Sequence, residues 1–531
     1  MCGIACIVGP RPDQHLFRRM LSAIEPRGEV EETLCEPDHL LGVQRLKIID
    51  RQRAVQPWTS SDGRMALCYN GEIYNFRELR VELEALGHRF RSDSDTEVVL
   101  EAYREWGDEA AARLRGEFAF AVVDRRTNDV YMARDPVGVK PLYWAQHAGH
   151  LYLASEVKAL VPSQAAVFEL PPGHHGLGAP DTRPRLQTYV DLLRIGDDEE
   201  VIEDPHEAAR LLREVLQDSI RVRLDTDLTV GVVLSGGVDS TLTLLHVREL
   251  HPDCVAFTIG APDSEDIEYA RRLTRSLGVP HEVIQLRPSA IRLRDVKEAI
   301  RIAELTEYGD VINAAVSVPL FDRVRRSGVK VVLCGDGSDE LFAGYEMYHQ
   351  PDPDLRKRTF QHMIRNLCRT ELQRVDRASM GQGVEARVPF LDLSVVRLAM
   401  RLPIEFKLRD GQEKWILRHA FADLLPDYVR TRPKNPLSHS SGLHERIRLY
   451  RPRFASMYRS FGYDVMEPMR RDFSIVLERH DMNLDRALAS EASRTDYTPL
   501  EHARDLLGAL RWNATAATRR WRTASSHRSA R

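Results

Sequence analysis

The segment "TVGVVLSGGVDS", Thr229 to Ser240, decides the fold of the second half of this chain. Its aliphatic run is typical of a buried strand, and the adjacent Gly236 and Gly237 predict a tight turn before a helix, "STLTLLHVREL". Such a turn presents free backbone N–H groups and the positive end of a helix dipole, which together favour an anion. The segment therefore predicts a phosphate-binding loop, although a purely structural glycine turn stays open at this point.

The loop differs from the common nucleotide-binding signatures. It lacks the GK[ST] of a Walker A loop, and its glycines do not have the GxGxxG spacing of a dinucleotide site. Asp239 is informative, because a carboxylate beside bound phosphates is repelled unless a cation lies between them. Mg²⁺ is the natural bridge between carboxylate and phosphate oxygens.

A second loop, "CGDGSDELFAGY" from Cys334 to Tyr345, also follows a predicted strand. From about residue 206 strands and helices alternate, which predicts a parallel doubly wound sheet with its ligand at the carboxyl ends of the strands. Two acidic, glycine-rich loops at one sheet edge are harder to explain structurally than one. We expect Asp239 and Asp339 to ligate Mg²⁺, and Ile259, at the end of "CVAFTIG", to pack on adenine.

The first part of the chain, to about residue 160, has short strands separated by turns and two predicted helices. The helices, "FRELRVELEALG" and "TEVVLEAYREWG", each end at a glycine. This is an α+β pattern with much antiparallel sheet. Residues 161 to about 205 are rich in Pro and Gly and then acidic, so we place a domain junction there. The expected domains are 1–190, 206–510 and a basic, disordered tail at 511–531.

Chain length, net charge and cysteine content limit the kinds of protein that this chain can be. A chain of 531 residues is too long for one hydrophobic core, and its net charge of -4 gives no reason to expect a nucleic-acid or membrane partner. The seven cysteines are scattered without a CxxC pair, which favours a reducing, cytoplasmic setting over a zinc site or disulfides. Six of them are expected to be buried apolar residues: Cys6, Cys35, Cys68, Cys254, Cys334 and Cys368.

The amino terminus reads "MCGIACIV", with a cysteine at position 2 ahead of a short apolar strand. No basic region precedes the apolar run and "GPRPDQH" interrupts it, so we expect no secretory signal. Two interpretations stay open and are compatible. The stretch can be a buried first strand, and Cys2 can be a nucleophile exposed by removal of Met1.

Nine motifs stand in order along the chain: "MCGI", "RLKIID", "NGEIYN", "SDTE", "RDPVGVKPLY", "LASEVKAL", "LSGGVDS", "GDGSDELFAGY" and "GVEARVPFLD". The SGGxDS loop after a strand resembles that of the N-type ATP pyrophosphatases. The order and spacing of all nine motifs, to about residue 450, resemble the glutamine-hydrolysing asparagine synthetase family. The resemblance implies an N-terminal nucleophile (Ntn) αββα glutaminase domain, followed by an α/β ATP pyrophosphatase domain with a helical C-terminal part.

In the first domain the resemblance implies a class II glutamine amidotransferase, in which the Cys2 thiolate attacks the glutamine amide and the free α-amine is the base. Asn70 and Gly71 would form the oxyanion hole. An arginine would pair with the glutamine α-carboxylate, and two carboxylates would hold its α-amino group. The implied glutamine-binding residues are Arg45, Asn70, Gly71, Glu72 and Asp95. A plain hairpin turn at "NGE" and a surface ion pair at Arg45 are the alternatives.

In the second domain the resemblance implies cleavage of ATP between its α and β phosphates, which adenylates a carboxylate. Lys434 matches a lysine that neutralises charge during this step, and a solvated surface lysine is the other interpretation. Asp336 stands where the well-studied relatives carry Glu, and would act as an acid or base on the incoming ammonia or reshape the acceptor pocket. The implied ATP-binding residues are Leu234, Ser235, Gly236, Gly237, Asp239, Ser240, Ile259, Cys334 and Gly335.

Two departures from the family pattern stand out. The family's Arg-Gly-Pro-Asp stretch reads "RGEV" at 27–30, beside the expected nucleophile. Asp336 replaces Glu, and it also argues against β-lactam closure, because the related β-lactam synthetases carry a tyrosine there.

The resemblance implies that ammonia from glutamine reaches an acyl-adenylate made from ATP with Mg²⁺, giving an amide, AMP and pyrophosphate. L-Aspartate is the leading acceptor. An amidotransferase for a different carboxylate, in a specialised pathway, is the first alternative. A non-catalytic relative that binds nucleotide or glutamine and regulates a partner is the second. The sequence shows no sign of the oligomeric state, and the family's frequent dimers imply a homodimer.

Overall fold

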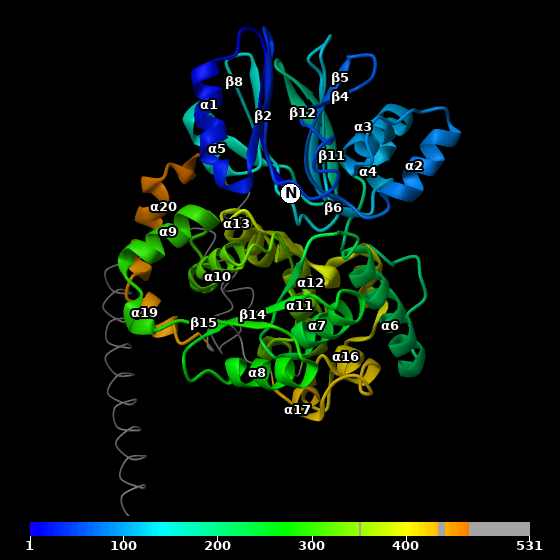
Figure 1. Ribbon diagram of the computed structural model, residues 1–531, viewed down its shortest axis with the longest axis vertical. Coiled ribbons are helices and arrows are strands. Elements are labelled where there is room, and N and C mark those ends of the chain that lie inside the picture. The colour runs from blue at the N-terminus through cyan, green and yellow to red at the C-terminus, as the bar shows by residue number, and fades with distance from the viewer. Residues whose placement is uncertain (350–351, 434–440, 467–531) are drawn as a thin grey trace, which may run out of the picture.

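The computed structural model describes residues 1–349, 352–433 and 441–466. Two halves lie one above the other in Figure 1, and the amino terminus lies at the level where they meet. The predicted Lys434 and the basic tail at 511–531 fall outside the described residues, as does the end of the expected second domain.

The first half contains two six-stranded antiparallel sheets. One has the order β10 (Val167–Glu169), β8 (Tyr143–His147), β9 (His150–Ala154), β1 (Cys2–Val8), β3 (His39–Arg45) and β2 (Val30–Glu36). The other has the order β12 (Thr182–Thr188), β11 (His174–Ala179), β7 (Val130–Arg134), β6 (Gly116–Asp124), β5 (Met65–Ile73) and β4 (Trp58–Thr59).

Alternation along the strands explains the layering. On β1, Cys2 and Ile4 pack into the core between the two sheets, while Ala5 and Ile7 pack on the opposite face with helix α1. The outer face of the second sheet packs against α2 and α3. The result is a helix–sheet–sheet–helix arrangement, with helices α1 (Gln14–Ala23) and α5 (Val157–Leu160) on one side and α2 (Phe76–Ala85), α3 (Asp95–Trp106) and α4 (Ala110–Arg113) on the other (Figure 1).

Two details of the first half follow the sequence. Helices α2 and α3 end just before Gly87 and Gly107, as predicted, and both glycines have positive φ angles of 99° and 54°. The Pro- and Gly-rich stretch contains the β11–β12 hairpin, which belongs to the second sheet. The chain therefore crosses to the second half only within residues 189–204.

The expectation that Cys35 is buried is wrong, because this side chain is exposed. It lies on β2, at the edge of its sheet, where exposed and half-buried residues alternate. An edge strand with one uncovered face exposes every second side chain, whatever its polarity.

The second half contains a five-stranded parallel sheet, so the predicted doubly wound sheet is confirmed. Its order is β15 (His281–Gln285), β14 (Val255–Gly260), β13 (Val230–Val233), β16 (Val331–Leu333) and β17 (Glu385–Arg387). Strands β13 and β16 are neighbours in register, with Val232 opposite Leu333. The two glycine-rich loops that follow them therefore start side by side.

Helices connect and surround this sheet (Figure 1). Before β17 they are α6 (Pro205–Val222), α7 (Val238–Leu250), α8 (Glu265–Leu277), α9 (Leu293–Ala303), α10 (Tyr308–Arg326), α11 (Ser338–Leu341), α12 (Pro353–Leu367) and α13 (Gln373–Met380). After it come α14 (Leu393–Arg401), α15 (Ile404–Lys407), α16 (Trp415–Ala420), α17 (Asp427–Arg430), α19 (His444–Arg448) and α20 (Phe454–Ser460), with a hairpin of β18 (Leu408–Arg409) and β19 (Gln412–Glu413). Within the described residues, every helix is too short or too polar to cross a membrane.

Candidate functional sites

Three side chains from separate segments hold Cys2 in place. The Cys2 backbone N–H donates to Asn70 Oδ1 at 2.9 Å, and the Cys2 carbonyl accepts from Arg27 Nε at 3.0 Å. Gln56 Nε2 lies 3.8 Å from the Cys2 sulfur, within the distance of an N–H···S contact. The buried cysteine is thus fixed along its main chain and contacted at its sulfur, as a positioned nucleophile needs to be.

Asn70 also carries an unused donor. Its Nδ2 is buried and has no hydrogen-bond partner among the described residues. An unsatisfied buried donor costs about 1–3 kcal/mol, so its presence beside a nucleophile favours a ligand role. The next residue, Gly71, has no space for a side chain, because a Cβ would lie 2.4 Å from the Glu117 carbonyl oxygen. The arrangement suits a developing oxyanion.

Arg45, Glu72 and Asp95 come to the same end of the sheets. Arg45 lies directly opposite Cys2 in the β1–β3 register, and its Nε pairs with Glu32 at 3.1 Å. Asp95, the first residue of α3, accepts from the Tyr69 hydroxyl at 2.7 Å. The predicted glutamine-binding residues are therefore brought together, although Arg45 already has an acidic partner that a ligand carboxylate would have to share.

Burial shifts the pKa values of the ionisable groups in this site. Burial raises the pKa of the Cys2 thiol, while the Met1 ammonium and Arg45 oppose that shift. Burial also raises the pKa of Asp95, and raises that of Glu72 well above its usual range with a further contribution from the Glu385 carboxylate. Both carboxylates would gain from a bound ammonium group.

Met1 occupies the junction between the two halves. Its amino group forms a buried ion pair with Glu385 Oε2 at 2.7 Å, and its side chain packs with Leu46, Val331 and Met380. With Met1 in place, the Cys2 nitrogen is an amide and cannot accept a proton. The Glu385 carboxylate comes from β17 of the other half, so Cys2, the predicted nucleophile, lies at the domain junction.

The second site is built by the loop between β13 and α7. Ser240 Oγ accepts from the Ser235 backbone N–H at 3.2 Å and so closes the loop. Gly236 has a φ of +72°, and a Cβ there would lie 2.7 Å from the Tyr269 side chain. Leu234 donates from its backbone to the Phe257 carbonyl at 2.8 Å, which ties the loop to the neighbouring strand.

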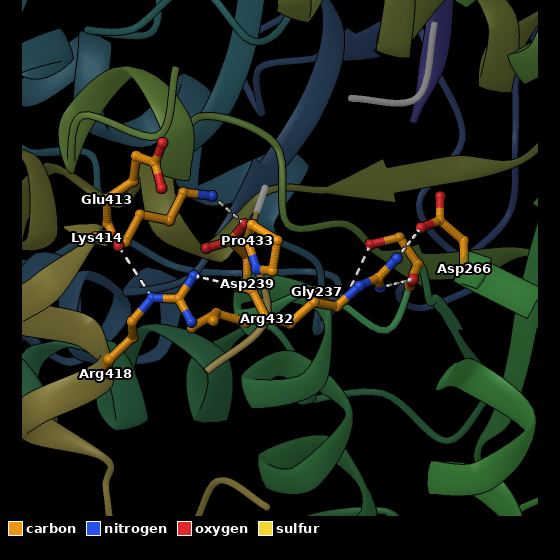
Figure 2. A pocket seen from close by; sticks show the side chains of 10 residues that line it. Gly237, Asp239, Asp266, Glu413, Lys414, Arg418, Arg432 and Pro433 are labelled. Carbon is orange, nitrogen blue, oxygen red and sulfur yellow. Dashed lines mark hydrogen bonds and ion pairs between the residues drawn. The ribbon is translucent and has the colours of Figure 1, made fainter. Parts of the chain in front are cut away.

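The two predicted metal ligands converge on one cation. Lys414 Nζ forms an ion pair with Asp339 Oδ1 at 2.6 Å and a second with Asp239, as Figure 2 shows for Asp239. Ser338 Oγ donates to Asp239 Oδ1 at 2.6 Å and fixes that carboxylate. Two carboxylates from separate loops that share one ammonium group are close enough to share a divalent ion, so the donor set fits Mg²⁺.

The second loop lies directly against the first. A Cβ on Gly335 would be 3.0 Å from the Asp239 Cβ, and the Cys334 backbone N–H donates to the Arg387 carbonyl at 2.9 Å. Ile259 is buried at the end of β14. The structure thus gathers the described members of the predicted ATP-binding set at one edge of the sheet.

Comparison with known proteins identifies both halves. Residues 1–173 match the glutamine amidotransferase domain family, and residues 211–363 and 351–460 match the asparagine synthase family. Asparagine synthetase B [glutamine-hydrolyzing] of Escherichia coli (strain K12) is 33% identical over 428 residues, which cover 76% of this chain and 75% of the relative. This chain belongs to the glutamine-hydrolysing asparagine synthetase family.

Two more distant members agree with this assignment. A putative asparagine synthetase [glutamine-hydrolyzing] of Methanocaldococcus jannaschii is 31% identical, with 76% of this chain and 82% of the relative covered. Asparagine synthetase [glutamine-hydrolyzing] 1 of Bacillus subtilis (strain 168) is 26% identical, with 82% and 86% covered.

Within this asparagine synthetase family member, the "RGEV" departure has a structural explanation. Arg27 makes a bidentate contact with Asp376 of the other half, at 2.8 and 3.0 Å. Glu29 pairs with Lys330 at 2.6 Å, also across the junction, and Val30 begins β2. The changed positions thus belong to the domain contact and to a strand end.

Asp336, the other departure, forms an ion pair with Arg374 at 2.7 Å. Arg374 also pairs with Glu371 at 2.5 Å and donates to Ser317 Oγ at 3.1 Å. Ser317 lies on α10, so one arginine connects Asp336 to that helix.

Sequence reasoning missed several residues of these sites. Gln56, which contacts the Cys2 sulfur, has no recognisable motif around it. Lys414, Arg418 and Arg432 line the pocket beside Asp239, and Arg432 Nη1 donates to the Ser235 carbonyl at 3.1 Å (Figure 2). A triphosphate needs cations near Asp239, but no local motif distinguishes these three among the 75 basic residues of the sequence.

Proposed function

We propose that this protein synthesises L-asparagine from L-aspartate, glutamine and ATP. Glutamine is hydrolysed in the first domain, and the ammonia reaches an aspartyl-adenylate in the second, releasing AMP and pyrophosphate. The observation that carries the proposal is the unpartnered Asn70 Nδ2 beside Cys2, which gives the family's nucleophile a ready oxyanion donor.

In the glutaminase step, the Cys2 sulfur attacks the side-chain carbonyl of glutamine. Asn70 Nδ2 and the Gly71 backbone N–H stabilise the oxyanion, ammonia leaves, and water hydrolyses the thioester to glutamate. Arg45 holds the glutamine α-carboxylate, and the buried carboxylates of Glu72 and Asp95 hold its α-amino group. The step requires removal of Met1, because the base is the freed α-amine of Cys2.

In the synthetase step, ATP lies at the carboxyl edge of the parallel sheet. The Ser235–Ser240 loop donates backbone N–H groups to the phosphates, and Asp239 and Asp339 hold Mg²⁺. When bound, that ion neutralises charge on the departing pyrophosphate. Lys414 and Arg432 already line this pocket, and Lys434 is proposed to add a further positive charge.

The names of the relatives favour aspartate as the acceptor. The three relatives described above are named as glutamine-hydrolysing asparagine synthetases, as are relatives from Arabidopsis thaliana and Oryza sativa. No contact in the described residues favours another carboxylate or a purely regulatory role. A cytoplasmic homodimer is part of the proposal, and light scattering of the purified protein tests the dimer.

The decisive experiment incubates purified protein with ATP, Mg²⁺, glutamine and aspartate. We expect asparagine, glutamate, AMP and pyrophosphate to form, and asparagine to form also when ammonia replaces glutamine. Pyrophosphate release with another carboxylate, and none with aspartate, would overturn the choice of acceptor. Mass spectrometry of the intact chain, before and after a glutamine analogue, checks that Met1 is absent and that Cys2 is labelled.

A further inference from the structure

Arg387 links the two candidate sites through its side chain and its main chain. It lies at the end of β17, in the synthetase half, and is 1% exposed. Its Nε donates to Glu385 at 2.6 Å and its Nη1 to the Arg223 carbonyl at 2.5 Å, so the side chain is held in one orientation.

The remaining nitrogen of Arg387 faces the glutaminase half. Nη2 lies 3.7 Å from Glu72 Oε2 and has no hydrogen-bond partner among the described residues. Glu72 follows Gly71 on β5 and belongs to the proposed glutamine-binding set. A separation of 3.7 Å is an ion pair that can shorten to a hydrogen bond by a small movement of either side chain.

Glu72 needs such a partner. The charged groups that face it are the Glu385 carboxylate and the Arg387 guanidinium from β17, the Asp95 carboxylate from α3 and the Met1 ammonium. Two of these groups are anionic, and removal of Met1 moves the terminal amine to Cys2, where the proposed mechanism uses it as a base. Arg387 is then the fixed cation that faces Glu72 from the synthetase half.

The main chain of the same residue supports the second nucleotide loop. The Arg387 carbonyl accepts from the Cys334 backbone N–H at 2.9 Å, and Arg387 lies opposite Leu333 in the β16–β17 register. Cys334 begins the loop that carries Asp336 and Asp339. A movement of this loop is therefore transmitted to the backbone of Arg387 through one hydrogen bond.

We propose that Arg387 is a positioning residue for glutamine: the synthetase domain supplies the cation that orients Glu72, and thereby links glutamine binding to the second nucleotide loop. This proposal rests on the proposed glutaminase function. The alternative is a purely structural role, in which Arg387 only holds β17 in place, because its contacts with Glu385 and the Arg223 carbonyl lie within the synthetase half. The two roles predict different effects of an Arg387 substitution on glutamine binding when residue 72 carries no charge.

The test uses the full-length protein and steady-state glutaminase kinetics. Arg387→Met should raise the KM for glutamine about tenfold with a smaller change in kcat, because Glu72 loses the cation that orients it towards the glutamine α-amino group. Arg387→Lys keeps the charge and should restore most of the affinity. In a Glu72→Gln background, Arg387→Met should change KM less than about twofold. Arg115→Met, which removes another arginine of the domain junction, is the matched control.

Ammonia-dependent asparagine synthesis is measured on the same variants. Synthesis that stays near the wild-type level in Arg387→Met supports a positioning role. An unchanged KM in Arg387→Met, an equal KM effect with and without Glu72, or a parallel loss of ammonia-dependent synthesis would each overturn the inference. If the wild-type protein has no glutaminase activity, the proposed function itself fails, so the two failures are distinguishable.

Discussion

The two candidate sites are prepared for their ligands in opposite ways. Around Cys2, polar groups are fixed by hydrogen bonds, and Asn70 Nδ2 has no hydrogen-bond partner among the described residues. Around Asp239, opposite charges are paired with one another, as in the contact of Lys414 with both aspartates. The first site is pre-organised for a neutral amide. The second would have to rearrange its ion pairs to hold the proposed metal–nucleotide complex.

The largest predicted effect tests the separation of the two sites. Cys2→Ala removes the sulfur nucleophile, so glutamine-dependent synthesis should fall by at least about a thousandfold. Ammonia-dependent synthesis should stay near the wild-type rate, because the nucleotide site is untouched. Cys35→Ala, at an exposed cysteine outside both sites, is the control. If glutamine-dependent synthesis survives in Cys2→Ala, the nucleophile is wrongly assigned.

The second prediction concerns the two aspartates of the nucleotide site, whose variants should lose synthesis rather than glutamine hydrolysis. Asp239→Asn or Asp339→Asn removes a negative charge from the pair that faces the proposed metal, and should lower synthesis about a hundredfold or more with either nitrogen source. Glutaminase activity should remain. The exposed Asp253→Asn serves as the comparison, and equal losses of glutaminase and synthetase activity in the site variants would contradict a catalytic role of these aspartates in the synthetase step alone.

The third prediction concerns the unpartnered donor. Asn70→Ala should reduce the kcat of glutamine hydrolysis about a hundredfold, because an oxyanion donor acts in the transition state. The KM for glutamine should change less, which steady-state kinetics would show. A change confined to KM would instead assign Asn70 to substrate binding alone.

The fourth prediction tests the self-neutralised state of the nucleotide site. Lys414→Met leaves Asp239 and Asp339 facing each other without their shared cation, so the ligand-free protein should lose about 5 °C in Tm. Mg²⁺ should restore part of that loss in the variant and should change the wild-type Tm less. If Lys414→Met and the wild type have the same Tm without Mg²⁺, the ion pairs of Lys414 do not stabilise the ligand-free site. The proposed difference between the two sites would then be wrong.

The smallest expected effect belongs to the departure from the family motif. Glu29→Ala removes a partly exposed ion pair with Lys330 and should change the free energy of unfolding by no more than about 0.5 kcal/mol. Glutaminase kinetics should stay within about twofold of the wild type. A larger kinetic effect, measured with glutamine alone, would show that the "RGEV" stretch acts on the nucleophile.

Local patterns predicted much of the fold. The aliphatic run before Ser235 and the one before Cys334 gave two neighbouring parallel strands, and their glycines gave the two loops. The β11–β12 hairpin of the first half was harder to predict, because the Pro- and Gly-rich stretch at 174–188 lacks strong alternation of polar and apolar residues. The alternation of polar and apolar residues identifies a strand best where one face is buried and the other is exposed.

The candidate sites were predicted less completely, for a physical reason. Cys2, Asn70 and Asp239 lie in motifs whose residues are close in sequence. Gln56 and Lys414 act by reaching across to groups 54 and 175 residues away, so only the folded chain brings them into place. No local pattern marks such a partner.

The burial of Met1 sets a time limit on maturation. The Met1 side chain is 2% exposed, and the carboxylate that pairs with its amino group belongs to a residue 384 positions further along. At the usual 5–20 residues per second, a ribosome needs about 20–80 s to reach that residue. Under the proposed mechanism, an aminopeptidase that removes the methionine has this interval before β17 exists to enclose its substrate. A chain that stays unprocessed would fold with Cys2, the proposed nucleophile, still blocked.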